Sequence, residues 1–237
     1  MKHNLTLRRG LCVLLSLLMC LSLLPAAVLA DEPATVTADF TADADAALAL
    51  LNAAKTGEAN SIWENNTLTL NGVNFTTTAE TAVILPAGAK IVLAEGTTNT
   101  IASSADNADM SYGIYAADGL TIEGSGTLIV RSAKATTTTD SNSYGIYADD
   151  GDITITGGTV IAASGTANAY SYGICLSGEN TITISGGAVN ATGGKSYAFS
   201  GGIGAGNVII SGGTVTAKGG QSSGESRGIS GGTKAAL

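Results

Sequence analysis

The sequence predicts an all-β fold, a parallel β-helix with three short strands per coil and a short helix capping its N-terminal end. The first observation is a repeat. The segment SYGIYADDGDITITGGTVIAA (143–163) has related copies at 111–130, 171–191 and 200–217. The second is that each copy holds three short apolar runs separated by glycine-rich or acidic corners. The third is that one such unit cannot bury its own apolar face, so the copies must stack on one another.

The first 30 residues have the pattern of a secretory signal peptide. Lys2, Arg8 and Arg9 precede an apolar run at 11–24, and Ala30 ends a stretch of small and apolar residues. The run is too short and wrongly flanked for a membrane span. The sequence therefore predicts cleavage after Ala30 and a secreted protein that has no membrane contact after cleavage.

Residues 31–62 are expected to form an extended segment followed by a capping helix. Residues 31–39 read as extended and disordered, and a helix is expected within 41–59. Thr41 or Asp43 is suited to the N-cap, and Gly57 to the end of the helix. Its apolar face is expected to cover the open end of the stack.

Residues 63–237 are expected to form the β-helix. Alternating apolar residues place one column of aliphatic side chains inside each strand position. The first-strand column is Ile114, Ile146, Ile174, Ile203 and Ile229. Aligning Leu70, Leu93, Ile122, Ile155, Ile184 and Ile210 in the second strands gives irregular steps of 23 to 33 residues. Glycine pairs between second and third strands predict sharp corners with positive φ. The last coil lacks a polar cap, so we expect a further coil or domain to follow it.

Composition excludes several classes of function. Removing the signal peptide leaves 8 basic against 19 acidic residues, a net charge of −11, and removes His3, the sole histidine. A strongly acidic chain lacks the basic footprint of a nucleic-acid-binding protein. Without histidine, Ser-His-Asp and Cys-His catalysis and histidine metal sites are absent. Cys175 is the one remaining cysteine, so no disulfide framework is expected.

Two sets of residues are candidates for binding. Alternation directs Tyr115 and Tyr147 outward beside each other, with Cys175 next in the column, and adjacent exposed aromatic rings suit sugar stacking. The alternative is that these rings shield the strands. An acidic corner before the second strand is expected to gather carboxylates from neighbouring coils, either as a Ca2+ site or as a solvated edge; its members are Asp118, Asp149, Asp150, Asp152 and Glu179. The polar loops between third and first strands vary in sequence, and solenoids usually present their function on such an edge.

Several stretches resemble a known family. ILPAGAKIVLAEGTTNTI (84–101), then GLTIEGSGTL (119–128) and GDITITGGTV (151–160), are similar to a bacterial secreted family of carbohydrate-binding proteins. The resemblance implies a right-handed parallel β-helix that binds polygalacturonate and cellulose, with calcium held by acidic residues at coil corners. Of the four steps that correspond to the family's acidic corner, only the second, Asp149–Asp152, is fully acidic, so the later coils depart from the family pattern.

Three functions follow as hypotheses. The first is a non-catalytic module that binds acidic polysaccharide, with calcium as its cofactor. The second is a cell-surface structural or adhesin repeat. The third is a pectate-lyase-like enzyme, which would need a base such as Arg131 or Lys134 close to the acidic corner of the next coil. Absence of histidine and scarcity of cations favour binding over catalysis.

Overall fold

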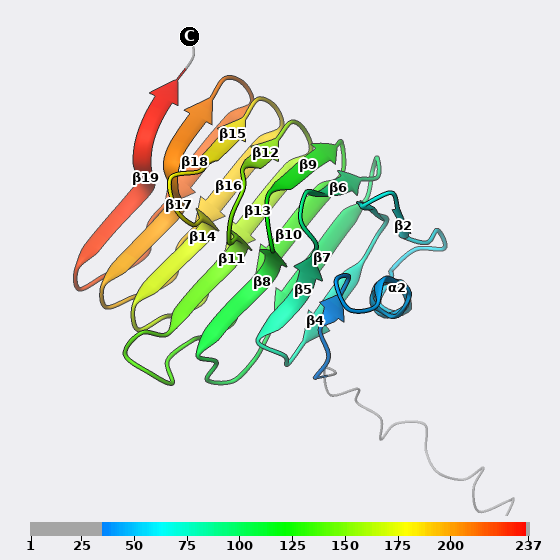
Figure 1. Cartoon of the computed structure of the whole chain (residues 1–237), viewed down its shortest axis with the longest axis horizontal. Coiled ribbons are helices and arrows are strands. Elements are labelled where there is room, and N and C mark those ends of the chain that lie inside the picture. Colours follow the sequence, from blue (N-terminus) through cyan, green and yellow to red (C-terminus); the bar gives the residue numbers. More distant parts are fainter. Residues whose placement is uncertain (1–34, 236–237) are drawn as a thin grey trace, which may run out of the picture. The chain divides into compact units, whose positions relative to one another are not determined.

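The computed structural model of the protein describes residues 35–235, and the predicted signal peptide, residues 1–30, lies outside them. Parallel strands stack coil upon coil, so the predicted β-solenoid is confirmed (Figure 1). One short helix lies near the N-terminal end of this part of the chain. No helix among these residues is long and apolar enough to cross a membrane.

The strands form three files, each a column of equivalent strands from successive coils. The first file is β5 (Thr81–Leu85), β8 (Met110–Ala116), β11 (Asn142–Ala148), β14 (Tyr170–Leu176), β17 (Phe199–Ile210) and β19 (Glu225–Ala235). The second is β3 (Thr67–Leu70), β6 (Ala89–Leu93), β9 (Leu120–Gly124), β12 (Ile153–Ile155) and β15 (Thr181–Ile184), continued by the ends of β17 and β19. The third is β4 (Asn74–Thr77), β7 (Thr98–Ser103), β10 (Thr127–Arg131), β13 (Thr159–Ala163), β16 (Ala188–Thr192) and β18 (Thr214–Lys218).

The aliphatic columns predicted from the alternation form the core. Ile114 pairs with Ile146, Ile146 with Ile174, and Ile174 with Ile203, and all four are fully buried. Burying such a side chain contributes about 1.5–3 kcal/mol. The predicted glycine corners are also confirmed, since Gly158 and Gly187 have φ of 73° and 74°. Those values lie in the left-handed region, which residues with a Cβ adopt only with strain.

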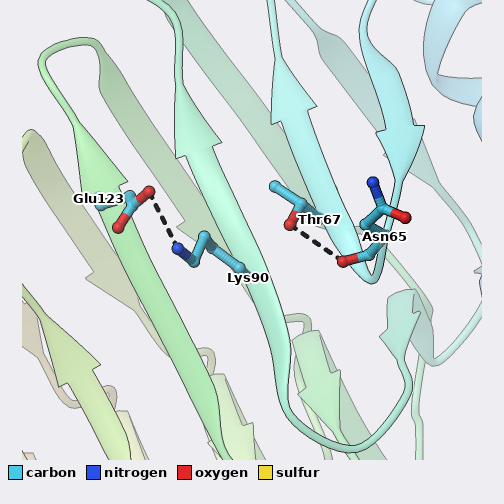
Figure 2. Close-up of polar contacts among 4 residues, drawn as sticks. All are labelled: Asn65, Thr67, Lys90 and Glu123. Carbon is cyan, nitrogen blue, oxygen red and sulfur yellow. Dashed lines mark hydrogen bonds and ion pairs between the residues drawn. The ribbon is translucent and has the colours of Figure 1, made fainter.

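One predicted alignment in the second file is wrong by two residues. Ile91, rather than Leu93, pairs with Ile122, so the step between these coils is 31 residues. A shift of two residues leaves the inward and outward faces unchanged, so the alternation alone does not distinguish the two registers. The true register sets Lys90 beside Thr121 and brings its ammonium to 3.2 Å from a carboxylate oxygen of Glu123 (Figure 2).

The N-terminal end is capped as predicted, with two differences. The helix α2 (Ala44–Ala53) begins after Asp43, whose carboxylate accepts the Ala46 amide, and ends before Gly57 is reached. Of the segment predicted to be extended and disordered, residues 31–34 lie outside the described part of the chain, and its end forms β1 (Ala38–Asp39), which pairs in parallel with β5. The cause is burial, since Ala38 and the adjacent Phe40 lie in the core. The strand β2 (Ile62–Glu64) runs antiparallel to β3 and ends the second file.

Candidate functional site

An aromatic cluster lies on the outer face of the first file. We call it the tyrosine face; it consists of Tyr112, Tyr115, Tyr144, Tyr147, Tyr172 and Phe199. The register places Tyr147 beside Tyr115 and Cys175 beside Tyr147, so the predicted column is confirmed. The other four rings were not predicted as site residues.

The cluster forms because the strands of the first file break strict alternation. In β8 both Gly113 and Ile114 are buried, so Tyr112 and Tyr115, three residues apart, face the same side. A Cβ on Gly113 would lie 2.4 Å from the Val130 Cγ1 atom and 2.7 Å from the Gly145 carbonyl oxygen, so glycine alone fits. The SYGIY and SYGIC spacing is therefore the signal that predicts a paired tyrosine face.

The rings stack along the coils. The centroid of Tyr144 lies 5.6 Å from that of Tyr112 and 6.3 Å from that of Tyr172, with interplanar angles of 19° and 15°. Tyr115 and Tyr147 stack at 5.9 Å, and Tyr112 meets Tyr115 edge-on at 5.3 Å. Such pairs contribute about 0.5–1.5 kcal/mol beyond the area that they bury. Because the ring faces cover one another, the cluster presents ring edges and hydroxyls outward.

Burial dominates the ionisation of these groups. Desolvation raises the pKa of Tyr147 to about 12 and also raises that of Tyr144, with nearby Cys175 adding to the shift. Burial likewise raises the pKa of the Cys175 thiol to about 12. These phenols are neutral hydrogen-bonding groups at physiological pH, and the thiol is protonated and weakly nucleophilic.

Asp149 links the tyrosine face to the acidic corner. Its carboxylate accepts hydrogen bonds from the hydroxyls of Tyr147, at 3.1 Å, and Tyr115, at 3.5 Å. The carboxylate is exposed. Two phenols and one carboxylate thus form a polar group at the end of β8 and β11, and it both donates and accepts hydrogen bonds.

The remaining carboxylates of the predicted acidic corner do not converge. Asp150 accepts from the Gly151 amide and the Asn180 side chain, both at 2.8 Å, and these bonds lower its pKa. Asp152 accepts from the Thr181 amide at 2.7 Å, while Asp118 and Glu179 are exposed. Within residues 35–235 no three acidic, histidine or cysteine side chains are grouped to hold a metal ion. Calcium binding at this corner therefore stays a prediction.

The opposite end of the first file is fixed by buried serines. We call Ser111, Ser143, Ser171 and Ser200 the corner serines; each is fully buried. The Ser171 hydroxyl donates to the Gly165 carbonyl at 2.8 Å and accepts from the Gly194 amide at 2.8 Å. Ser143 and Ser200 repeat both bonds in their coils. Ser143, Ser171 and Ser200 thus hold the loops that lead into their strands, whereas the Ser111 hydroxyl donates to the Glu80 carbonyl and accepts from the Ala133 amide of the following loop.

Those loops form a polar edge, which we call the loop edge, made by residues 132–141, 164–169, 193–198 and 219–224. Two open hollows lie on it. One, of about 360 Å³, is lined by Lys195, Ser196, Gln221, Ser222 and Ser223, and the other, of about 380 Å³, by Thr139, Asn168 and Tyr197. Tyr197 is 60% exposed. The sequence indicated this edge as variable, but it did not single out Tyr197.

The two cations considered for a lyase lie away from the acidic corner of the next coil. Arg131 and Lys134 lie at the loop edge, before β11 begins, whereas Asp149 follows the end of that strand. The seven residues of β11 separate the two ends by roughly 20 Å. The expectation that these cations lie near the acidic corner of the next coil is therefore wrong.

No family model, no curated protein and no solved structure matches the chain.

Proposed function

We propose that this is a secreted, non-catalytic carbohydrate-binding protein whose tyrosine face contacts an extended polysaccharide. The observation that carries the proposal is the hydrogen-bonded group of Tyr115, Tyr147 and Asp149 at the edge of a cluster of six aromatic rings. Phenols and carboxylates hydrogen-bond sugar hydroxyls, and the ring edges offer apolar area for sugar C–H groups.

The position of this group suits a long, repetitive ligand. Tyr112, Tyr144 and Tyr172 occupy equivalent positions in three successive coils, about 4.8 Å apart. The side chains are held in place by stacking, so little rotamer freedom is lost when a ligand binds. Tyr144 is buried, but the half-buried Tyr112 and Tyr172 on either side of it keep part of their edges exposed, and such a preformed row fits a polymer chain better than a small, enclosed molecule.

The ligand that we propose is an acidic polysaccharide such as polygalacturonate, in keeping with the family resemblance. Asp149 is negatively charged and exposed, so a uronate beside it would be repelled without a cation. Calcium, which prefers several oxygen ligands, would bridge protein and uronate oxygens there. Binding to the acidic polymer would then require calcium, whereas binding to a neutral glucan would not.

Affinity electrophoresis through gels containing polygalacturonate or soluble cellulose derivatives, with calcium or with a chelator, tests the proposal. We expect Tyr147→Ala to weaken retardation about tenfold, because both the ring and its hydroxyl are lost. Tyr147→Phe keeps the ring and should weaken it about two- to fivefold. Thr154→Ala, on the outer face of the second file, is the matched control.

The outcomes separate the alternatives. Equal retardation of Tyr147→Ala and the wild-type protein would show that the tyrosine face is not the binding surface. Absence of wild-type retardation in every gel would refute the proposal. Release of unsaturated uronides from pectate, followed by absorbance, would show an enzyme instead; we expect a flat trace.

A further inference from the structure

We propose a second glycan-binding site on the loop edge, built around Lys195 and Tyr197, for a sugar chain that carries anionic groups. It shares with the proposed function only the class of ligand. Its residues are separate from the tyrosine face, so either site can fail without the other. The argument rests on charge, exposure and the two hollows.

Positive charge gathers on this edge in an otherwise acidic protein. Of the eight basic residues that follow the signal peptide, four lie at or beside the loop edge: Arg131, Lys134, Lys195 and Lys218. Arg227 lies on the tyrosine face instead, with its guanidinium 5.7 Å from the centroid of the Phe199 ring. Arg227 pairs with Glu225 at 2.7 Å, and Lys90, on the second file, pairs with Glu123 (Figure 2). Within residues 35–235 no ion pair involves Lys195, so its ammonium is available to an anion.

Within the loop edge only the loop 132–141 contains an acidic residue, Asp140, and Glu225, next to the loop 219–224, is paired with Arg227. Asp106, Asp109 and Asp140 belong to the loops that precede β8 and β11. Asp109 already accepts hydrogen bonds from Thr138 and Ser141. The loops 164–169, 193–198 and 219–224 contain no acidic residue. The half of the edge around Lys195 therefore has a local positive charge.

Tyr197 supplies the apolar half of the site. Its ring is far more exposed than that of Tyr144, which is 8% exposed within the tyrosine face. Lys195 and Ser196 border one hollow, and Tyr197, the next residue, borders the other. An exposed ring beside an ammonium offers a sugar both a stacking surface and a partner for its carboxylate or sulfate.

The backbone holds these residues in place. The Ser196 amide donates to the Gln221 carbonyl at 2.8 Å, and the Ala167 amide donates to the Lys195 carbonyl at 2.8 Å. The Gly224 amide donates to the Tyr197 carbonyl at 2.9 Å. Loop residues thus continue the coil stacking beyond the strands, which gives the site a rigid floor.

The same stacking extends the site along the edge. Lys134, Thr166, Lys195 and Gln221 occupy equivalent positions, because the residue after each one pairs with its counterpart in the next coil. At about 4.8 Å per coil, Lys134 lies roughly 10 Å from Lys195. A polymer lying along this edge would meet two ammonium groups in line.

Retardation in gels of polygalacturonate, of a sulfated polysaccharide and of a neutral β-glucan tests the site, using the variants Lys195→Gln, Tyr197→Ala and Tyr147→Ala. Lys90→Gln is the matched control, because it removes one lysine from another face. We expect Lys195→Gln to weaken binding to anionic gels about two- to fivefold, and Tyr197→Ala about three- to tenfold. Raising salt to about 0.5 M should weaken wild-type binding and affect Lys195→Gln less.

Each result decides something. Weaker retardation of Lys195→Gln, with wild-type retardation of Lys90→Gln, supports the site. Retardation in only one of the two anionic gels shows whether the site prefers carboxylate or sulfate groups. Wild-type binding by both Lys195→Gln and Tyr197→Ala overturns it, even where Tyr147→Ala binds weakly and the tyrosine face stands. If Lys195→Gln and Lys90→Gln weaken retardation equally, the cause is the change in net charge of the protein, and the site is also overturned. Absence of wild-type retention in every gel overturns both sites.

Discussion

Replacing Ser171 by alanine is expected to destabilise the whole stack, although the hydroxyl touches no ligand. The Ser171 hydroxyl donates to the Gly165 carbonyl at 2.8 Å, accepts from the Gly194 amide at 2.8 Å and lies 2.8 Å from the Ser164 hydroxyl. Ser171 is fully buried, so water is not positioned to replace the lost oxygen.

The magnitude follows from the partners that remain. The Gly194 amide keeps the Ser164 hydroxyl at 3.0 Å, whereas the Gly165 carbonyl loses this donor. One lost hydrogen bond contributes about 1 kcal/mol, and a buried unsatisfied group costs about 1–3 kcal/mol. We therefore expect the free energy of unfolding to fall by about 2–3 kcal/mol.

Urea unfolding, followed by circular dichroism, measures this change as a lower midpoint at unchanged slope. Ser185→Ala, at an exposed position after β15, is the control and should change stability by less than about 0.5 kcal/mol. Ser164→Ala combined with Ser171→Ala should be less costly than the two separate losses added together, because the hydroxyls contact each other. A loss below about 0.5 kcal/mol in Ser171→Ala would refute the role given to the corner serines.

Two further predictions concern packing and ionisation. Gly145→Ala should lower the free energy of unfolding by about 2 kcal/mol or more, because its Cβ would lie 2.5 Å from the Gly173 carbonyl oxygen; Gly57→Ala, with nothing within 4 Å, is the control, and equal urea midpoints would contradict the reasoning. The contribution of Tyr144 to stability should be constant below about pH 10, where free tyrosine titrates, and be lost above it, because burial raises the pKa of Tyr144 and favours its neutral form in the folded state. Unfolding at about pH 9 and pH 11 measures this loss as a fall in stability, which Tyr144→Phe should reduce; identical falls in both proteins would count against it.

The core could be predicted from sequence because its signal is local and repeated. Alternation with period two is enough to place Ile114 and Ile146 inside and Tyr115 and Tyr147 outside, whatever the loop lengths between them. The same rule fails at Gly113, where the backbone turns two successive residues inward. Tyr112 therefore reaches the outer face, although strict alternation does not assign it there beside Tyr115.

The functional groups were harder to predict, because their partners come from other coils. Asp150 and Asp152 looked like members of one acidic cluster, yet each is hydrogen-bonded to a donor of the following coil. The corner serines were not predicted as structural residues, and their hydroxyls are buried against loop backbone. The sequence shows that a residue is polar. It does not show whether its side chain is hydrogen-bonded to a backbone amide 20 or 30 residues away.

The corner serines have a consequence for how this molecule diversifies. They attach each loop at its junction with the strand. The outer part of the loop can therefore vary in length and composition without a change in the packing of the core. The 132–141 loop already has ten residues where 164–169 has six, yet β11 and β14 remain paired residue for residue. Insertions and substitutions at that edge should therefore have little effect on the stability of the core. The coils can stay constant while the loops evolve different binding surfaces.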